Sequence, residues 1–242
     1  MRWRDAAFAH WPADATALAR VVPDGLEVAT YDGDAYLGVV PFVMSEIGVP
    51  GVPGGRSFPE LNLRTYVRRD GERGVYFLSL DAADRLGVGV ARALYALPYY
   101  RAELRVRRVE DDDDPPAVTV RSRRTHRDAP PARFDATCRA TGAPFTPEAG
   151  SLAAFLTENY AFYAAGGRGS DPVLLRGRID HEPWTLRPAS LDVRSNTLFR
   201  AAGLDRPTGD PVVHYSPGAA VTAGVVRPVD AGAPLGSAPE RP

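Results

Sequence analysis

The sequence predicts an α+β protein that is mainly β. Three observations lead to this prediction: short runs of β-branched and aromatic residues, turn signals such as Asp32-Gly33 and Asp70-Gly71 between them, and helical periodicity confined to a few segments. Strands and helices do not alternate as they do in parallel α/β proteins, so the expected sheet is antiparallel. One domain over residues 1–230, followed by a loose tail over 231–242, accounts for the chain.

The N-terminal half is expected to hold one short helix, four strands and a longer helix. The first helix covers residues 12–22 and ends at Pro23-Asp24-Gly25. The strands follow in the runs EVATYDG, AYLGVVPFVM, LNLRTYVRR and GVYFLSL. Asp81 is expected to cap a helix over residues 82–96, which Pro98 ends.

The C-terminal half is expected to begin with a hairpin and to continue with mixed elements. Strands 99–109 and 117–125 flank an acidic tip over residues 110–116. Further strands are predicted at 132–140 and 173–181, with a last pair over 212–229. Helices are predicted from Ser151 to about residue 164, before a turn at 166–169, and over 188–202.

The charged residues are nearly balanced, and all 29 basic side chains are arginines. Arginine does not supply a neutral amine, so no side chain can form a Schiff base with a ketone or hold pyridoxal phosphate. A formal net charge of −1 argues against nucleic acid and anionic membranes as partners. Cys138 is the single cysteine and no apolar signal segment opens the chain, so a soluble cytoplasmic protein is expected.

A polar face follows one predicted strand. Because alternate side chains of a strand share a face, Glu60, Asn62, Arg64 and Tyr66 lie on one side, with apolar residues between them. On an open sheet such a face is wet. In a closed barrel it lines a polar cavity, where a carboxylate, an amide and a guanidinium suit a small polar or acidic ligand.

Three other clusters have two readings each. His181, followed by Glu182 and Trp184, is either a general base beside an aromatic wall or a structural group at a strand end. The polar run Glu158-Asn159-Tyr160 is either a site or an exposed helix face. The arginines around the acidic tip suggest nucleic acid, but their alternation with apolar residues favours the solvated outer face of a hairpin.

The four histidines lack metal-ligand spacing and no phosphate-binding loop appears, so neither metal nor cofactor is expected.

Several blocks resemble one family. GVVPF, FPELNLRTYV, GVYFLSLDA, ARALYALPYYRA, FLTENYAFY and HEPWTLRPA occur in order and look like the YqjF-like family of unknown function. That family is similar to acetoacetate decarboxylase in fold. The resemblance implies a cone-shaped antiparallel β-barrel with flanking sheets and a few helices, and a ligand cavity inside the cone.

The resemblance also bears on chemistry. The segment Leu97-Pro98-Tyr99-Tyr100 is similar to the turn that carries the catalytic lysine pair of the decarboxylase, and tyrosines stand in the lysine positions. Decarboxylation through an enamine is therefore not expected. A tyrosine hydroxyl at Tyr99 either serves as an acid, base or hydrogen-bond donor, or fills the volume of the lost lysine.

Three functions remain open. The first is a ligand-binding protein for a small keto or carboxylic acid. The second is a lysine-independent lyase, hydratase or isomerase that acts on such an acid, and the third is a protein-interaction scaffold without a ligand. The expected catalytic residues are Tyr99, Glu60 and His181, and the expected ligand-binding residues are Arg64, Asn62, Asp81, Glu182 and Trp184. Self-association of the chain stays open.

Overall fold

A computed structural model describes residues 1–47, 55–83, 97–109, 116–166 and 173–229. Its strands are β1 Arg2–Ala13, β2 Glu27–Val28, β3 Ala35–Ile47, β4 Arg56–Arg69, β5 Glu72–Ala82, β6 Tyr99–Val109, β7 Ala117–Arg124, β8 Arg133–Ala140, β9 Ala161–Gly166, β10 Val173–His181, β11 Arg187–Asn196, β12 Val212–Ala223 and β13 Arg227–Pro228. The helices of the described ranges are α1 Ala15–Ala19, α3 Leu152–Thr157 and α4 Leu198–Ala201. The mainly β class predicted from the sequence is confirmed.

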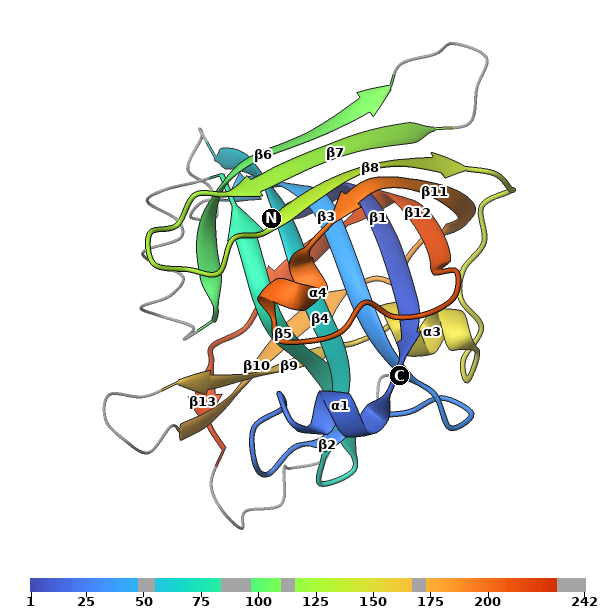
Figure 1. The fold of residues 1–242 in the computed structure, drawn as a ribbon. Coiled ribbons are helices and arrows are strands. Elements are labelled where there is room, and N and C mark those ends of the chain that lie inside the picture. The colour runs from blue at the N-terminus through green and yellow to red at the C-terminus, as the bar shows by residue number, and fades with distance from the viewer. Residues whose placement is uncertain (48–54, 84–96, 110–115, 167–172, 230–242) are drawn as a thin grey trace.

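The strands form one branched sheet in the order β13-β10-β9-β5-β6-β7-β8-β11-β12-β1-β3-β4-β2, with added pairings β10–β12 and β4–β5. Strands β12, β1, β3, β4 and β5 make a continuous wall that branches at both ends. One branch closes through β6, β7, β8 and β11, and the other closes through β9 and β10. The pairings are antiparallel except those of β5 with β6 and with β9. The first branch lies over the wall at the top of Figure 1.

Each face of the wall packs against one branch. Leu61 and Leu63 of β4 point into a core shared with Leu104, Val120 and Phe134 of the first branch. The alternate residues of β4 point to the second branch, where Tyr66 packs with aromatic residues of β5 and β9. Since side chains alternate along a strand, Glu60, Asn62 and Arg64 face the second interior with Tyr66. The polar face is therefore inside the fold and is not a wet surface.

Three predicted elements differ from the structure at the N-terminal end and near Asp81, and one strand was not predicted. The helix predicted over 12–22 is only α1, and Asp14 caps it by accepting a hydrogen bond from the Thr16 amide at 2.8 Å. Residues 2–13 form β1. This strand was not predicted, because it is buried on both faces and its sequence shows no alternation of polar and apolar residues. The run EVATYDG shortens to β2. Asp81 lies within β5 and does not cap a helix at 82; residues 84–96 of that prediction lie outside the described residues.

The C-terminal corrections concern two helices and one pairing. Only residues 152–157 of the helix predicted from Ser151 are helical, and β9 follows. The helix predicted over 188–202 is β11 followed by the one-turn α4; alternating exposure along β11 marks a strand with one covered face. Strands β12 and β13 do not pair with each other. Each of them pairs with β10 instead. The acidic tip over 110–115, most of the turn at 166–169 and the tail over 231–242 lie outside the described residues.

The other strand predictions hold. Strands β6 and β10 match the predicted 99–109 and 173–181, and β7 and β8 end within one residue of the predicted bounds. In the part of the chain that the structure describes, no helix has the length and apolar character needed to cross a bilayer.

Candidate functional site

A row of side chains crosses the wall at its centre, on the face that looks into the second interior. The strand registers place His10 of β1 opposite Gly38 of β3, and Gly38 opposite Arg64 of β4. A Cβ atom on Gly38 would lie 2.9 Å from His10 Cδ2 and 3.2 Å from Arg64 Cγ. Glycine at this position therefore lets the imidazole and the arginine stem approach each other over the strand.

Arg64 is the buried cation of this row, with 5% of its surface exposed. Its Nη2 donates to the Leu156 carbonyl at 3.1 Å, and the guanidinium carbon lies 5.6 Å from the Phe8 ring centre and 5.7 Å from that of Tyr66. No carboxylate of the described residues forms an ion pair with it, and its Nε has no hydrogen-bond partner there. A buried charge without a counter-charge is costly, so this arginine favours an anion in its vicinity.

Other buried polar atoms of the same interior also lack partners. Neither ring nitrogen of His10 has a hydrogen-bond partner among the described residues, and the same holds for the Asn62 Oδ1 atom. Burial, together with the positive charges of Arg64 and His214, lowers the pKa of His10 well below its ordinary value. The imidazole is thus neutral at neutral pH, with one nitrogen able to donate and one able to accept a hydrogen bond.

A small cavity opens beside Arg64. It has room for about 20 Å³, enough for a single water molecule. Around Arg64 its lining is largely aromatic and apolar, and Thr157, Asn159 and His181 add polar groups. The apolar lining residues are Trp3, Phe8, Val75, Phe77, Ala161, Phe162, Ile179 and Trp184. A site of this composition surrounds one fixed charge with a medium of low polarity, which strengthens binding of an anion.

A carboxyl and phenol pair lies further along β4. Tyr99 donates its hydroxyl hydrogen to Glu60 Oε2 at 2.8 Å, and both side chains are buried. Burial raises the pKa of Glu60 to about 7, although hydrogen bonds from Tyr99 and Asn62 act in the opposite direction. A carboxyl that titrates near neutrality is able both to give and to take a proton.

The raised pKa of Glu60 predicts a pH dependence of stability. The folded protein keeps the Glu60 proton up to about pH 7, whereas the unfolded chain loses it near the ordinary value of 4.5. The contribution of Glu60 to the free energy of unfolding is therefore greatest below pH 4.5. It falls by about 3 kcal/mol as the pH rises through 7. Urea unfolding at pH 5 and pH 8 measures the difference.

Glu60→Gln is the matched control, because glutamine resembles the protonated carboxyl in shape and stays neutral. The difference between the two pH values should shrink by the same amount in this variant. An unchanged difference would show that Glu60 is ionised in the folded protein at both pH values.

Asp81 takes part in a structural ion pair. Arg124 of β7 donates to Asp81 Oδ1 at 2.7 Å from Nε and to Oδ2 at 3.3 Å from Nη2, and both side chains are almost fully buried. Burial raises the pKa of Asp81, and the hydrogen bonds and charge of Arg124 oppose this rise. The guanidinium carbon of Arg124 also lies 4.0 Å from the centre of the Tyr100 ring. Asp81 is thus already paired, and it does not line the cavity beside Arg64.

His181 and Trp184 line the same cavity as Arg64, while Glu182 does not. The His181 ring stacks on Tyr160 at 4.6 Å between centres, and its Nδ1 lies 2.8 Å from the Glu182 carbonyl oxygen. Because a carbonyl oxygen only accepts hydrogen bonds, Nδ1 is the donor in this contact. Glu182 is exposed and lines an outer groove with His181, which corrects its expected place beside the ligand.

The polar run Glu158-Asn159-Tyr160 is neither a helix face nor a free site. The two oxygens of Glu158 accept from the Trp184 amide at 2.9 Å and from the Tyr160 hydroxyl at 2.6 Å. Arg73 donates to the Glu158 carbonyl at 3.1 Å and to Asn159 Oδ1 at 3.3 Å. These bonds fix the connection from α3 to β9 against β5, and they support the cavity wall.

Sequence reasoning missed His10 and Arg124. His10 lies in the run FAHW, which shows no strand alternation, and only the strand register brings it to Gly38 and Arg64. Arg124 was assigned to the outer arginines of the hairpin, but it points inward at the end of β7. Among the described residues, no group of three or more His, Cys, Asp or Glu side chains is arranged to hold a metal ion.

Solved structures share this architecture. The enduracididine biosynthesis enzyme MppR complexed with pyruvate superposes with a TM-score of 0.65 at 13% identity, over 94% of this chain and 90% of that one. Acetoacetate decarboxylase from Legionella pneumophila gives 0.62 at 16% identity, over 95% and 86% of the two chains. The fold is therefore that of the acetoacetate decarboxylase-like proteins, as expected.

The particular family follows from closer similarity. The chain belongs to the DUF2071 family of uncharacterized conserved proteins, whose model matches residues 1–220. Uncharacterized protein YqjF of Bacillus subtilis strain 168 is 40% identical over 217 residues, which cover 88% of this chain and 85% of YqjF. The resemblance to the YqjF-like family is thereby confirmed.

Proposed function

We propose that the interior beside Arg64 binds a small keto or carboxylic acid, with the guanidinium as the partner of the carboxylate. The observation that carries the proposal is the buried guanidinium without a carboxylate partner among the described residues. A carboxylate accepts two parallel hydrogen bonds from one guanidinium, and Arg64 Nε is unpaired on the described part of the chain. Binding would satisfy both the charge and this donor.

The remaining polar groups suit the rest of such a ligand. His10, held close to Arg64 by Gly38, offers a neutral donor or acceptor to a ketone or hydroxyl oxygen. The pyruvate named for MppR is a keto acid of this class and supports the choice by analogy of fold alone. Since the cavity has room for about 20 Å³, even a three-carbon acid requires the surrounding side chains to shift on binding.

The chemistry proposed for the site does not use an amine. The 242 residues contain no lysine, and Tyr99 holds Glu60 where the resemblance implies a lysine pair. A second candidate function is a lyase, hydratase or isomerase in which Glu60, with its pKa of about 7, moves a proton. A cytoplasmic setting is part of the proposal, and it is supported by Cys138 being the single cysteine of the sequence, which excludes an intramolecular disulfide.

Calorimetry with pyruvate, acetoacetate and lactate tests the binding proposal, with acetamide as a smaller, neutral control. We expect at least one acid to bind and acetamide not to bind, because the charge of the ligand supplies the attraction to Arg64. Equal binding of acetamide, or no binding by any acid, would contradict the proposal.

The two keto acids of this set, pyruvate and acetoacetate, separate binding from catalysis. In D₂O, proton NMR follows exchange of the hydrogens next to the keto group. An enzyme that uses Glu60 as a base should exchange them, and Glu60→Gln should slow the exchange by about 100-fold. A protein that only binds the acid leaves the exchange at the rate of the buffer.

A further inference from the structure

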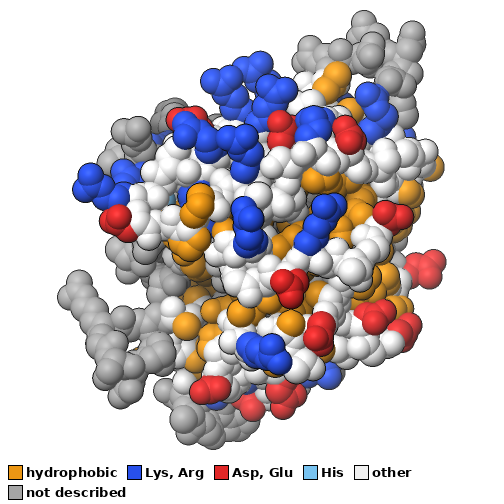
Figure 2. Space-filling view, viewed as in Figure 1, with side chains coloured by type: hydrophobic (Ala, Val, Ile, Leu, Met, Phe, Trp, Pro, Cys, Tyr) orange, Lys and Arg blue, Asp and Glu red, His pale blue; other side chains and the backbone are white. Residues whose placement is uncertain are grey.

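A groove lined by charged residues lies on the outside of the first branch. Its lining differs from the largely aromatic lining of the cavity beside Arg64. Strands β6, β7 and β8 turn one face outward, and on it a groove of about 600 Å³ is lined by five arginines and two acids. The arginines are Arg101, Arg105, Arg121, Arg123 and Arg133, and the acids are Glu103 and Asp135. Figure 2 shows basic side chains gathered over this part of the molecule.

The strand register puts like charges opposite each other. Arg105 of β6 pairs with Arg121 of β7, and the next pair on the same face of the sheet is Glu103 with Arg123. Like charges directly across an antiparallel pair are unfavourable. Among the described residues of β6 and β7, an ion pair between the two strands is formed at Glu103, whose carboxylate lies 2.8 Å from Arg123.

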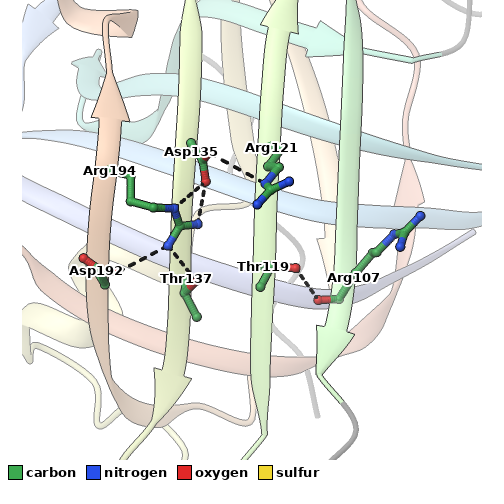
Figure 3. Close-up of polar contacts among 7 residues, drawn as sticks. All are labelled: Arg107, Thr119, Arg121, Asp135, Thr137, Asp192 and Arg194. Atoms are coloured by element: carbon green, nitrogen blue, oxygen red, sulfur yellow. Dashed lines mark hydrogen bonds and ion pairs between the residues drawn. The ribbon is translucent and has the colours of Figure 1, made fainter.

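The acids do not balance the groove. Asp135 serves two arginines at once: its Oδ2 lies 3.7 Å from Arg121 Nε, and it accepts hydrogen bonds from Arg194 of β11 (Figure 3). Within the described residues, Arg101, Arg105 and Arg133 have no carboxylate partner. The groove therefore carries an excess of three positive charges, although the chain as a whole has a net charge of −1.

The lining also limits the kind of anion. Arginine side chains form paired hydrogen bonds with phosphate oxygens, so adjacent exposed arginines suit a group with several phosphates. Phe134 is the one aromatic residue of the lining, and it is buried with 1% exposed, so no ring is offered for a base to stack upon. The two acids within the groove repel a long, uniformly charged backbone such as that of nucleic acid.

We propose that this groove binds a compact anion with several phosphate groups, at a site separate from the interior beside Arg64. Arg105 and Arg121 provide the centre of the site, where an anion relieves their mutual repulsion. Arg133 of β8 and Arg101 of β6 extend it toward one end of the strands, the end at which Glu103 pairs with Arg123.

Titration calorimetry with tripolyphosphate at about 0.15 M salt tests the proposal. We expect the wild-type protein to bind tripolyphosphate, and the double variant Arg105→Ala/Arg121→Ala to bind it at least about 10-fold more weakly. Arg206→Ala is the control: it removes one exposed arginine from a different groove, beside Asp205, and should leave the affinity unchanged. Arg64→Met should also leave it unchanged.

Three results would overturn the proposal. These are no binding of tripolyphosphate, an equal loss in Arg206→Ala, and an equal affinity of the double variant and the wild type. Comparing the affinity for ATP with that for tripolyphosphate separates recognition of phosphate groups from recognition of a base. ATP should bind no more tightly than tripolyphosphate. Tighter binding of ATP, or of a short DNA duplex, would assign the groove to a nucleotide or to nucleic acid and would contradict a site for compact phosphate groups.

Discussion

Arg64→Met should greatly weaken binding of the acid while making the free protein more stable. Methionine is of similar length and brings no charge into the interior. The Leu156 carbonyl keeps a partner, since Tyr66 also donates to it at 2.7 Å. Removing an uncompensated buried charge should raise the free energy of unfolding by about 1 kcal/mol or more. The affinity for the acid should fall by about 100-fold, because the carboxylate loses its charged partner.

The two effects are measured together by urea unfolding and by calorimetry with the acid that binds the wild-type protein. Arg69→Met is the matched control on the same strand: Arg69 bonds to the Gly25 carbonyl and pairs with Asp70, away from the cavity. It should leave the affinity as it is. A stable Arg64→Met protein with wild-type affinity would place the ligand elsewhere.

Asp81→Ala and Arg124→Met should each lower the free energy of unfolding by about 3 to 5 kcal/mol, because each leaves one buried charge without its partner. The double variant Asp81→Ala/Arg124→Met removes both charges. It should be more stable than either single variant, and the double-mutant cycle by urea unfolding gives the coupling between them. Additive losses would show that the pair is not coupled in the folded protein.

This ion pair also holds the neighbourhood of Tyr99. Asp81 pairs in register with Tyr100, and Leu80 pairs with Tyr99 where β5 and β6 run parallel. Breaking the pair should therefore loosen the Tyr99–Glu60 hydrogen bond. Because that hydrogen bond lowers the pKa of Glu60, its loss should raise this pKa further, and the pH dependence expected from Glu60 should become stronger in Asp81→Ala if the variant is still folded.

The sequence allowed the polar face of β4 to be predicted, because period-two alternation of polar and apolar residues is a local property. Whether that face is wet or enclosed depends on sheet closure, and closure rests on pairings between distant segments such as β4 with β5 and β12 with β10. The closed, cone-shaped barrel was predicted from the resemblance to a known fold, because alternation along a strand does not show how the sheet closes.

Errors arose where local pattern and tertiary structure disagree. The residues of β1 are buried on both faces and show no period, while β11 alternates with period two yet was expected to be helical. His10 could not be placed beside Arg64 from sequence, since their proximity depends on the register of three strands and on the missing side chain of Gly38. Asp81 and Glu182 are polar and near the site in sequence, but one is paired with Arg124 and the other faces solvent.

We propose that the buried guanidinium of Arg64, and not an amine, receives the acid inside the cone. The most direct measurement is the distance between Arg64 and the carboxylate in a crystal structure of the protein saturated with pyruvate. We expect two hydrogen bonds of about 2.7–2.9 Å from the guanidinium to the carboxylate oxygens. A carboxylate bound outside the cone, with Arg64 still bonded to the Leu156 carbonyl alone, would contradict the proposal.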